Sequence, residues 1–119
     1  GAPGEAAEAA RELERFRRAT RKLVREFREG LGGLLGWSVD VCDEGGAAIW
    51  HLTSRLRKGR ALAFRLRPAE AGRLAEFELL ATPWAEELLG DRQAAAQLEA
   101  RGSVPGFLAH ATRLLARAP

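Results

Sequence analysis

The chain has 119 residues, of which 46% are hydrophobic and 29% are charged, so it can form one small domain or a compact head with one projecting element. Its single cysteine excludes an internal disulfide and indicates a reducing compartment. No apolar run approaches the roughly 20 residues that cross a bilayer, and acidic residues interrupt the alanine-rich start, so we expect neither membrane contact nor a signal peptide.

The positive charge is concentrated near the amino terminus. The net charge is only +3, but the segment from Arg11 to Arg28 has eight basic residues against three acidic ones. Such a local excess indicates an anionic partner. Residues 1–4 have the composition of a tag remnant or flexible start, and the chain has no methionine. We therefore expect a longer protein upstream.

Residues 5–35 are predicted to form a coiled-coil dimerisation helix, since Ala, Glu, Arg and Leu dominate this segment. Apolar or small residues recur at alternating steps of three and four, which is a heptad seam. The seam comprises Ala6, Ala9, Leu13, Phe16, Thr20, Leu23 and Phe27. A small head cannot bury such a seam. We therefore expect the last five seam residues, from Leu13 to Phe27, to form the interface with a second copy. Gly30, Gly32 and Gly33 either loosen this helix or end it.

A globular head is expected over residues 36–119. Residues 37–41 and 48–52 alternate in polarity around a turn at 44–46, which predicts a hairpin. A third strand is predicted over 61–66 and a fourth over 74–80. Consecutive strands with short turns indicate an antiparallel meander.

Two helices are expected after the sheet. Thr82 and Pro83 have the residue types of an N-cap and a first helical position, and Gly90 interrupts the helix before it continues towards Leu98. The last helix starts at residues 103–105, with one face formed by Phe107, Leu108, Ala111, Leu114 and Leu115. Trp37, Trp50 and Trp84 are expected in the core or at an interface. The fold class is therefore α+β.

The inventory of reactive residues argues against an enzyme. His51 and His110 have no paired spacing for a metal. Cys42, next to Asp43, has no activating pattern, so a buried structural thiol is expected. The glycines near residue 32 lack the lysine and hydroxyl residue of a phosphate-binding loop. We expect no catalytic residue, no metal and no cofactor.

Several short motifs resemble one family. Glu26-Phe27-Arg28, followed by residues 35–40, resembles the helix-to-strand junction of the C-terminal domain of the Mad-one family of spindle assembly checkpoint proteins, with Glu-Phe-Arg and then Gly-aromatic-x-Ile-Asp. Residues 50–54 are similar to its aromatic-Arg-Leu-Thr-Ser strand end. Residues 103–108 are similar to its Ser-Ile-Pro-Ala-Phe-Leu, which opens the final helix.

The resemblance implies an RWD-like head on a parallel two-stranded coiled coil. It also implies a homodimer that acts at kinetochores in mitosis, resides in the nucleus and at the nuclear envelope in interphase, and supports assembly of the mitotic checkpoint complex. The family binds the checkpoint protein Mad-two through an upstream segment that is absent from this chain.

The resemblance further implies a docking site on the helix. An Arg-Leu-Lys motif of the family, needed for binding a threonine-phosphorylated segment of the kinase Bub-one, matches Arg15-Phe16-Arg17 here, with Phe for Leu and Arg for Lys. Arginine forks pair with phosphate oxygens at any cellular pH. We expect the partner-binding residues to be Arg15, Phe16, Arg17, Arg18 and Arg21, with the two cations of the motif flanking the seam.

Three other interpretations remain open. The basic helix can be a solvated coiled-coil face, or the chain can be a different RWD-like kinetochore scaffold subunit. It can also be a basic coiled-coil nucleic-acid-binding protein. A second basic cluster, at residues 55–60 with Arg65 and Arg67, is explained mainly by solvent-facing strand positions, and the stacking aromatics of an RNA-binding sheet are not evident. Nucleic acid is thus the less favoured partner.

Overall fold

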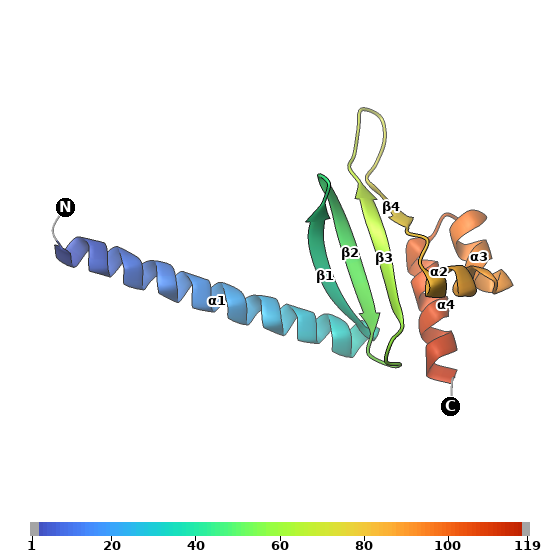
Figure 1. Ribbon diagram of the computed structural model, residues 1–119, viewed down its shortest axis with the longest axis horizontal. Helices are drawn as coiled ribbons and strands as arrows, with labels where there is room; N and C mark the ends of the chain where they lie inside the picture. Colours follow the sequence, from blue (N-terminus) through green and yellow to red (C-terminus); the bar gives the residue numbers. More distant parts are fainter. Residues whose placement is uncertain (1–2, 118–119) are drawn as a thin grey trace.

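The computed structural model describes residues 3–117 as an α+β chain with one long helix, a four-stranded antiparallel sheet and three short helices. Figure 1 shows the long helix projecting away from a compact head. The overall dimensions are 67 × 43 × 21 Å. This arrangement confirms the predicted fold class and the order of helix, sheet and helices.

Helix α1, Pro3–Leu35, runs without a break through all three glycines near its end. Its 33 residues correspond to about 50 Å at about 1.5 Å per residue. The helix ends at Gly36, which has a φ of 82° and donates its N–H to the carbonyl oxygen of Gly32 at 2.9 Å. Only glycine adopts this left-handed C-terminal cap easily. Of the predicted start at residues 1–4, residues 1 and 2 lie outside the described residues, and 3 and 4 belong to α1.

The sheet is a meander of neighbouring antiparallel strands in the order β1-β2-β3-β4. The strands are β1 Trp37–Glu44, β2 Ala47–Ser54, β3 Ala61–Arg67 and β4 Glu76–Leu79. Gly45 and Gly46 both have positive φ angles, 61° and 82°, as the two-residue turn of a tightly twisted hairpin requires.

Strand β4 is shorter than the predicted 74–80. Arg67 pairs with Glu76 at the end of the β3–β4 ladder, and the next residue of the chain is Pro68, which has no N–H to extend it. Leu74 consequently lies in the connecting loop with 87% of its surface exposed.

Three helices follow the sheet, not two. They are α2 Pro83–Leu89, α3 Arg92–Glu99 and α4 Val104–Arg117. The predicted continuation past Gly90 is wrong because Asp91 starts a new helix, accepting hydrogen bonds from the N–H groups of Gln93 and Ala94 at 3.0 and 3.1 Å. Thr82 is the predicted N-cap of α2, and its hydroxyl accepts from the N–H of Ala85.

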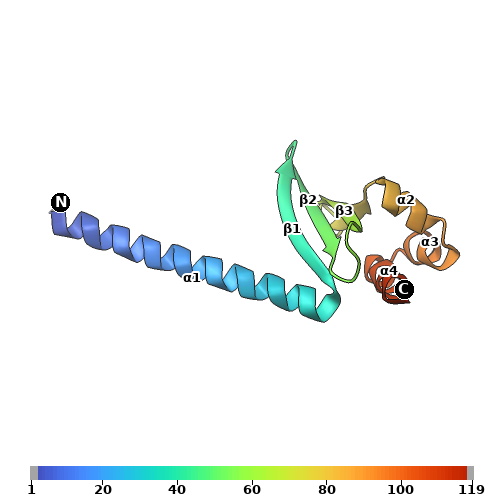
Figure 2. The same cartoon turned by 60° about the horizontal axis from the view of Figure 1, so that its bottom comes forward.

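The core lies between one face of the sheet and the three short helices, which Figure 2 shows gathered on the side of the sheet away from α1. Its buried members are Trp37, Leu52, Leu62, Phe64, Ala85, Leu88, Ala94, Phe107, Ala111 and Leu115. Trp50 and Trp84 pack against this cluster while partly exposed, so all three tryptophans lie where they were expected. Within residues 3–117, no helices gather on the opposite face of the sheet in this way.

Candidate docking surface on the long helix

Helix α1 exposes a stripe of large apolar side chains. The exposed fractions are 49% for Leu13, 69% for Phe16, 66% for Leu23 and 65% for Phe27. Positions three and four apart share one side of a helix, so these side chains form a continuous surface. Gly32 is the one α1 residue that is buried among those described. The apolar seam predicted from the sequence is thus left uncovered by the chain's own head.

The stripe is wider than the predicted seam. Val24, Leu34 and Leu35 are also exposed apolar residues of α1, and a rotation of about 100° per residue places them at or beside the line from Thr20 to Phe27. The hydroxyl of Thr20 donates to the carbonyl oxygen of Phe16 at 2.9 Å, so its hydrogen-bonding need is met within the helix. The sequence contained a signal for this wider stripe. Val24 lies four residues after Thr20, and Leu35 lies four residues after Leu31.

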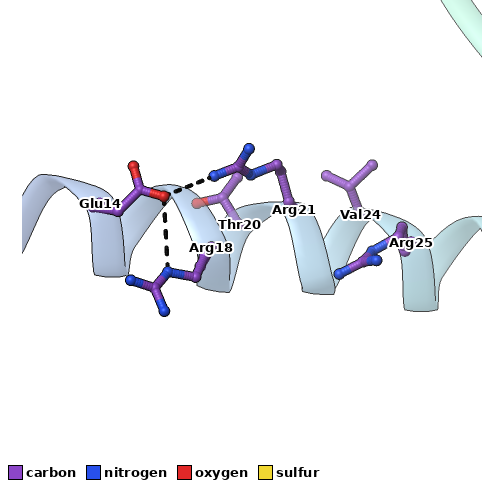
Figure 3. A pocket seen from close by; sticks show the side chains of 6 residues that line it. All are labelled: Glu14, Arg18, Thr20, Arg21, Val24 and Arg25. Carbon is purple, nitrogen blue, oxygen red and sulfur yellow. Dashed lines mark hydrogen bonds and ion pairs between the residues drawn. The ribbon is translucent and has the colours of Figure 1, made fainter.

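Two of the predicted docking cations already have a partner. Glu14 forms ion pairs with Arg18 at 3.7 Å and with Arg21 at 3.2 Å, as Figure 3 shows. The same three residues line a shallow hollow with Thr20, Val24 and Arg25. Exposed ion pairs of this kind contribute only about 0–1 kcal/mol, so an incoming anion can compete with Glu14 at little cost.

Arg15 and Arg17 form no ion pair with any residue between 3 and 117. Side chains two positions apart on an α-helix differ by about 200° in direction. Arg17 lines a shallow hollow with Phe16, Thr20 and Arg21 beside the apolar stripe, whereas Arg15 points to the far side of the helix. The expectation that both cations flank the seam therefore fits Arg17 but not Arg15.

Two ion pairs join the end of α1 to the head. Arg28 Nη2 lies 2.7 Å from the Asp40 carboxylate. Arg55 donates two hydrogen bonds to the Glu29 carboxylate, at 2.9 and 3.1 Å, and a third to Ser38. The hydrogen bond from Arg55 lowers the pKa of Glu29 below its ordinary value, and the cation's charge acts in the same direction.

Gly32 leaves room at this junction for the side chain of Arg55, which the sequence did not reveal. A Cβ atom at this position would collide with the guanidinium of Arg55. The sequence placed Arg55 in a solvent-facing basic cluster, but its partner comes from α1. Two other members of that cluster, Arg65 and Arg67, do face solvent on β3, and both pair with Glu78 on β4, at 3.8 and 2.9 Å.

Cys42 is exposed, and the prediction of a buried structural thiol is wrong. It lies on the sheet face that the short helices do not cover. Its Sγ donates to Glu44 Oε1 at 3.6 Å, and His51 Nε2 lies 4.0 Å from the same oxygen. Desolvation raises the pKa of Cys42, and the hydrogen bond to Glu44 adds to this effect. These three residues were not grouped in the sequence because the register of two strands, not spacing along the chain, brings them together.

The second histidine stabilises the packing of the short helices. His110 Nε2 on α4 lies 3.0 Å from Asp91 Oδ1, the carboxylate that caps α3. The pKa of Asp91 is lowered first by the hydrogen bond from the N–H of Ala94, and then by His110 and the N–H of Gln93. His110 therefore has a structural partner within the head.

Comparisons of the chain with known protein families, with curated proteins and with solved structures found no match. Across residues 3–117, no helix is both long enough and apolar enough to cross a membrane. The candidate site is therefore defined by its geometry alone: an uncovered apolar stripe on α1, with Arg17 and Arg21 at its border.

Proposed function

We propose that this chain is a homodimeric docking module of the spindle assembly checkpoint, related to the C-terminal domain of the Mad-one family. In this proposal α1 pairs in parallel with a second copy, and the paired helices dock a threonine-phosphorylated segment of the kinase Bub-one at kinetochores. The head is of the RWD-like type and the chain is not an enzyme. One observation carries the proposal: Phe16, Leu23 and Phe27 each expose about two thirds of their surface along one helix.

The apolar stripe supports dimerisation. Monomeric proteins rarely expose a contiguous apolar patch of more than a few hundred Å². The head leaves the stripe uncovered, and the pairs Arg28–Asp40 and Arg55–Glu29 join the end of α1 to the head. A heptad stripe is buried well by an identical stripe, so a second copy is the partner that fits.

The charge supports an anionic ligand on the dimer. Parallel pairing brings the basic segments of both copies side by side, which doubles the local positive excess. Like charges in proximity repel, so a bound anion stabilises the pair. A phosphothreonine carries about −1.5 to −2 charges near neutral pH and offers three acceptor oxygens. This makes a phosphorylated peptide a better ligand than its unphosphorylated form.

Arg17 and Arg21 are the residues best placed to hold the phosphate. They border the same hollow beside Phe16, and each guanidinium can bond two phosphate oxygens. To bind the phosphate, Arg21 would give up its ion pair with Glu14. The phosphate and the Glu14 carboxylate compete for the same guanidinium. Arg15, on the far side of the helix, contributes to the general positive potential.

The proposed kinship rests on the family-like motifs, which lie at junctions between elements of this fold. Arg28 of the first motif pairs with Asp40 of the second, so the two motifs together form the junction of α1 and β1. At the end of β2, the hydroxyl of Ser54 accepts hydrogen bonds from the N–H groups of Leu56 and Arg57. Ser103 accepts from the N–H of Gly106 at the start of α4. The nuclear and kinetochore location, and the role in assembling the checkpoint complex, rest on this kinship.

The test is calorimetric titration of the chain with a Bub-one segment in its phosphorylated and unphosphorylated forms. The proposal requires that the phosphorylated peptide binds at least tenfold more tightly than the unphosphorylated one. Equal affinity for the two peptides would favour an RWD-like scaffold subunit. Tighter binding to duplex DNA at physiological salt, with a linear fall of log affinity against log salt concentration, would favour a nucleic-acid-binding protein.

A further inference from the structure

Three potential metal ligands converge on the face of the sheet that is opposite the short helices. Cys42 and Glu44 are two residues apart on β1 and so share one face. His51 on β2 is opposite Asp40, and Ile49 is opposite Cys42, which places His51 on that same face. Glu44 directly precedes the turn that joins β1 to β2.

The donor atoms are close enough for one ion. Cys42 Sγ is 3.6 Å from Glu44 Oε1, which is 4.0 Å from His51 Nε2, and all three donor atoms lie within 4.8 Å of one another. Zinc binds sulfur at about 2.3 Å and nitrogen or oxygen at about 2.0–2.2 Å, so tetrahedral geometry separates its donors by roughly 3.3–3.7 Å. Side-chain rotations that move the donors by about an ångström would complete this geometry.

The scaffold under the three side chains is rigid. Strands β1 and β2 are paired along their full length, from Trp37 opposite Ser54 to Glu44 opposite Ala47. Ile49, across from Cys42 on the same face of the sheet, is only 2% exposed and is an apolar neighbour of the ligands. Ligands on paired strands are positioned more reproducibly than ligands on loops.

We infer that Cys42, Glu44 and His51 bind a divalent transition-metal ion of the zinc class, with water in the fourth position. A thiolate, an imidazole and a carboxylate form a ligand set typical of zinc, whereas calcium and magnesium prefer oxygen ligands alone. The thiolate and carboxylate together neutralise the two positive charges of the ion. As the metal–sulfur bond forms, the thiol proton leaves to solvent and the hydrogen bond to Glu44 is replaced.

This site is separate from the docking surface. Its ligands belong to β1 and β2, and none of them borders the apolar stripe or the hollows of Arg17 and Arg21. Metal binding and phosphopeptide binding can therefore succeed or fail independently. Neither result depends on the other proposal.

Cobalt(II) titration of the untagged protein tests the inference, since a bond from cobalt to a thiolate gives a near-ultraviolet charge-transfer band. Because Cys42 is the only cysteine, such a band reports this residue alone. We expect saturation at one ion per chain and displacement of the cobalt by zinc. Absence of the band, or saturation at one ion per two chains, would overturn the site as assigned.

Two variants and a matched control identify the ligands. Cys42→Ser should abolish the band, and His51→Gln should weaken zinc binding by more than about 100-fold, because loss of even a group that only orients a ligand costs about 10–100-fold. His110→Gln replaces the other histidine, which pairs with Asp91, and should leave zinc affinity within twofold. If His51→Gln left the zinc affinity unchanged, the cobalt band would report only metal binding to the Cys42 thiol, and the three-residue site would be refuted. Circular dichroism confirms that each variant is folded.

Discussion

Dimerisation through α1 is tested most directly by the double substitution Leu23→Gln and Phe27→Gln. Phe27 is 65% exposed, and a phenylalanine of about 200 Å² therefore offers about 130 Å² to a partner. At about 25 cal/mol per Å² this surface contributes about 3 kcal/mol when covered. Leu23, 66% exposed, adds about 2 kcal/mol, which is two thirds of the upper value of about 1.5–3 kcal/mol for fully burying a leucine side chain.

A dimer contains each side chain twice, so full coverage would contribute about 10 kcal/mol. Half of that surface suffices for a clear result: a loss of about 5 kcal/mol raises the dimer dissociation constant at least about a thousandfold. Glutamine is a good helix former, so the variant should keep the helical signal of the wild type in circular dichroism.

Sedimentation equilibrium over a range of concentrations measures the effect. The wild type should sediment as a dimer and the double variant as a monomer at the same micromolar concentration. Leu74→Gln is the matched control, because Leu74 is 87% exposed on the β3–β4 loop and should leave the dimer intact. A variant that keeps the wild-type mass would show that the stripe does not hold the copies together, and a monomeric wild type would remove the dimer altogether.

The remaining predictions concern the ligand and the head. Charge reversal of Arg17 and Arg21 should abolish phosphopeptide binding in calorimetry, whereas Arg15→Glu should weaken it less than tenfold; equal losses would contradict the assignment by helix face. Phe107→Ala should lower the free energy of unfolding by about 3–5 kcal/mol in urea denaturation, because Phe107 is fully buried. Asp91→Asn keeps a capping side chain but removes the charge. Because the folded-state pKa of Asp91 is below its ordinary value of 3.8, the wild type should be more stable than the variant above that pH, and the difference should vanish as the pH falls through the folded-state value.

Local sequence signals were sufficient for most of the elements. The long helix follows from the composition of its segment. The hairpin follows from the alternating polarity on both sides of Gly45 and Gly46, and the register of β1 and β2 places the turn at these two glycines. The break between α2 and α3 was missed although its signal was local: Asp91 precedes a helix-forming run and has the residue type of an N-cap. Gly90 ends α2 and Asp91 starts α3, so the two neighbouring residues together separate the helices.

Errors at single residues have a different origin, since they depend on contacts between distant segments. Cys42 was expected to be buried because free cysteines usually are, but its strand face is the one without helical cover. Gly32 was interpreted as a helix breaker, whereas its lack of a side chain makes room for Arg55. The convergence of Cys42, Glu44 and His51 depends on strand register, which the sequence defines only after the hairpin is paired.

The junction of α1 with the head connects the fold to the proposed function. The pairs Arg28–Asp40 and Arg55–Glu29 are largely exposed, so solvent screens them and they add little to stability. As two contacts on adjacent residues of α1, they still favour one tilt and one rotation of the helix, by no more than the free energy that they contribute. Rotation decides which side of α1 faces away from the head, and hence whether the apolar stripe is open to a second copy. The two pairs therefore bias, by a small free energy, how two heads are placed in a dimer, and with them the anion-binding border of the stripe.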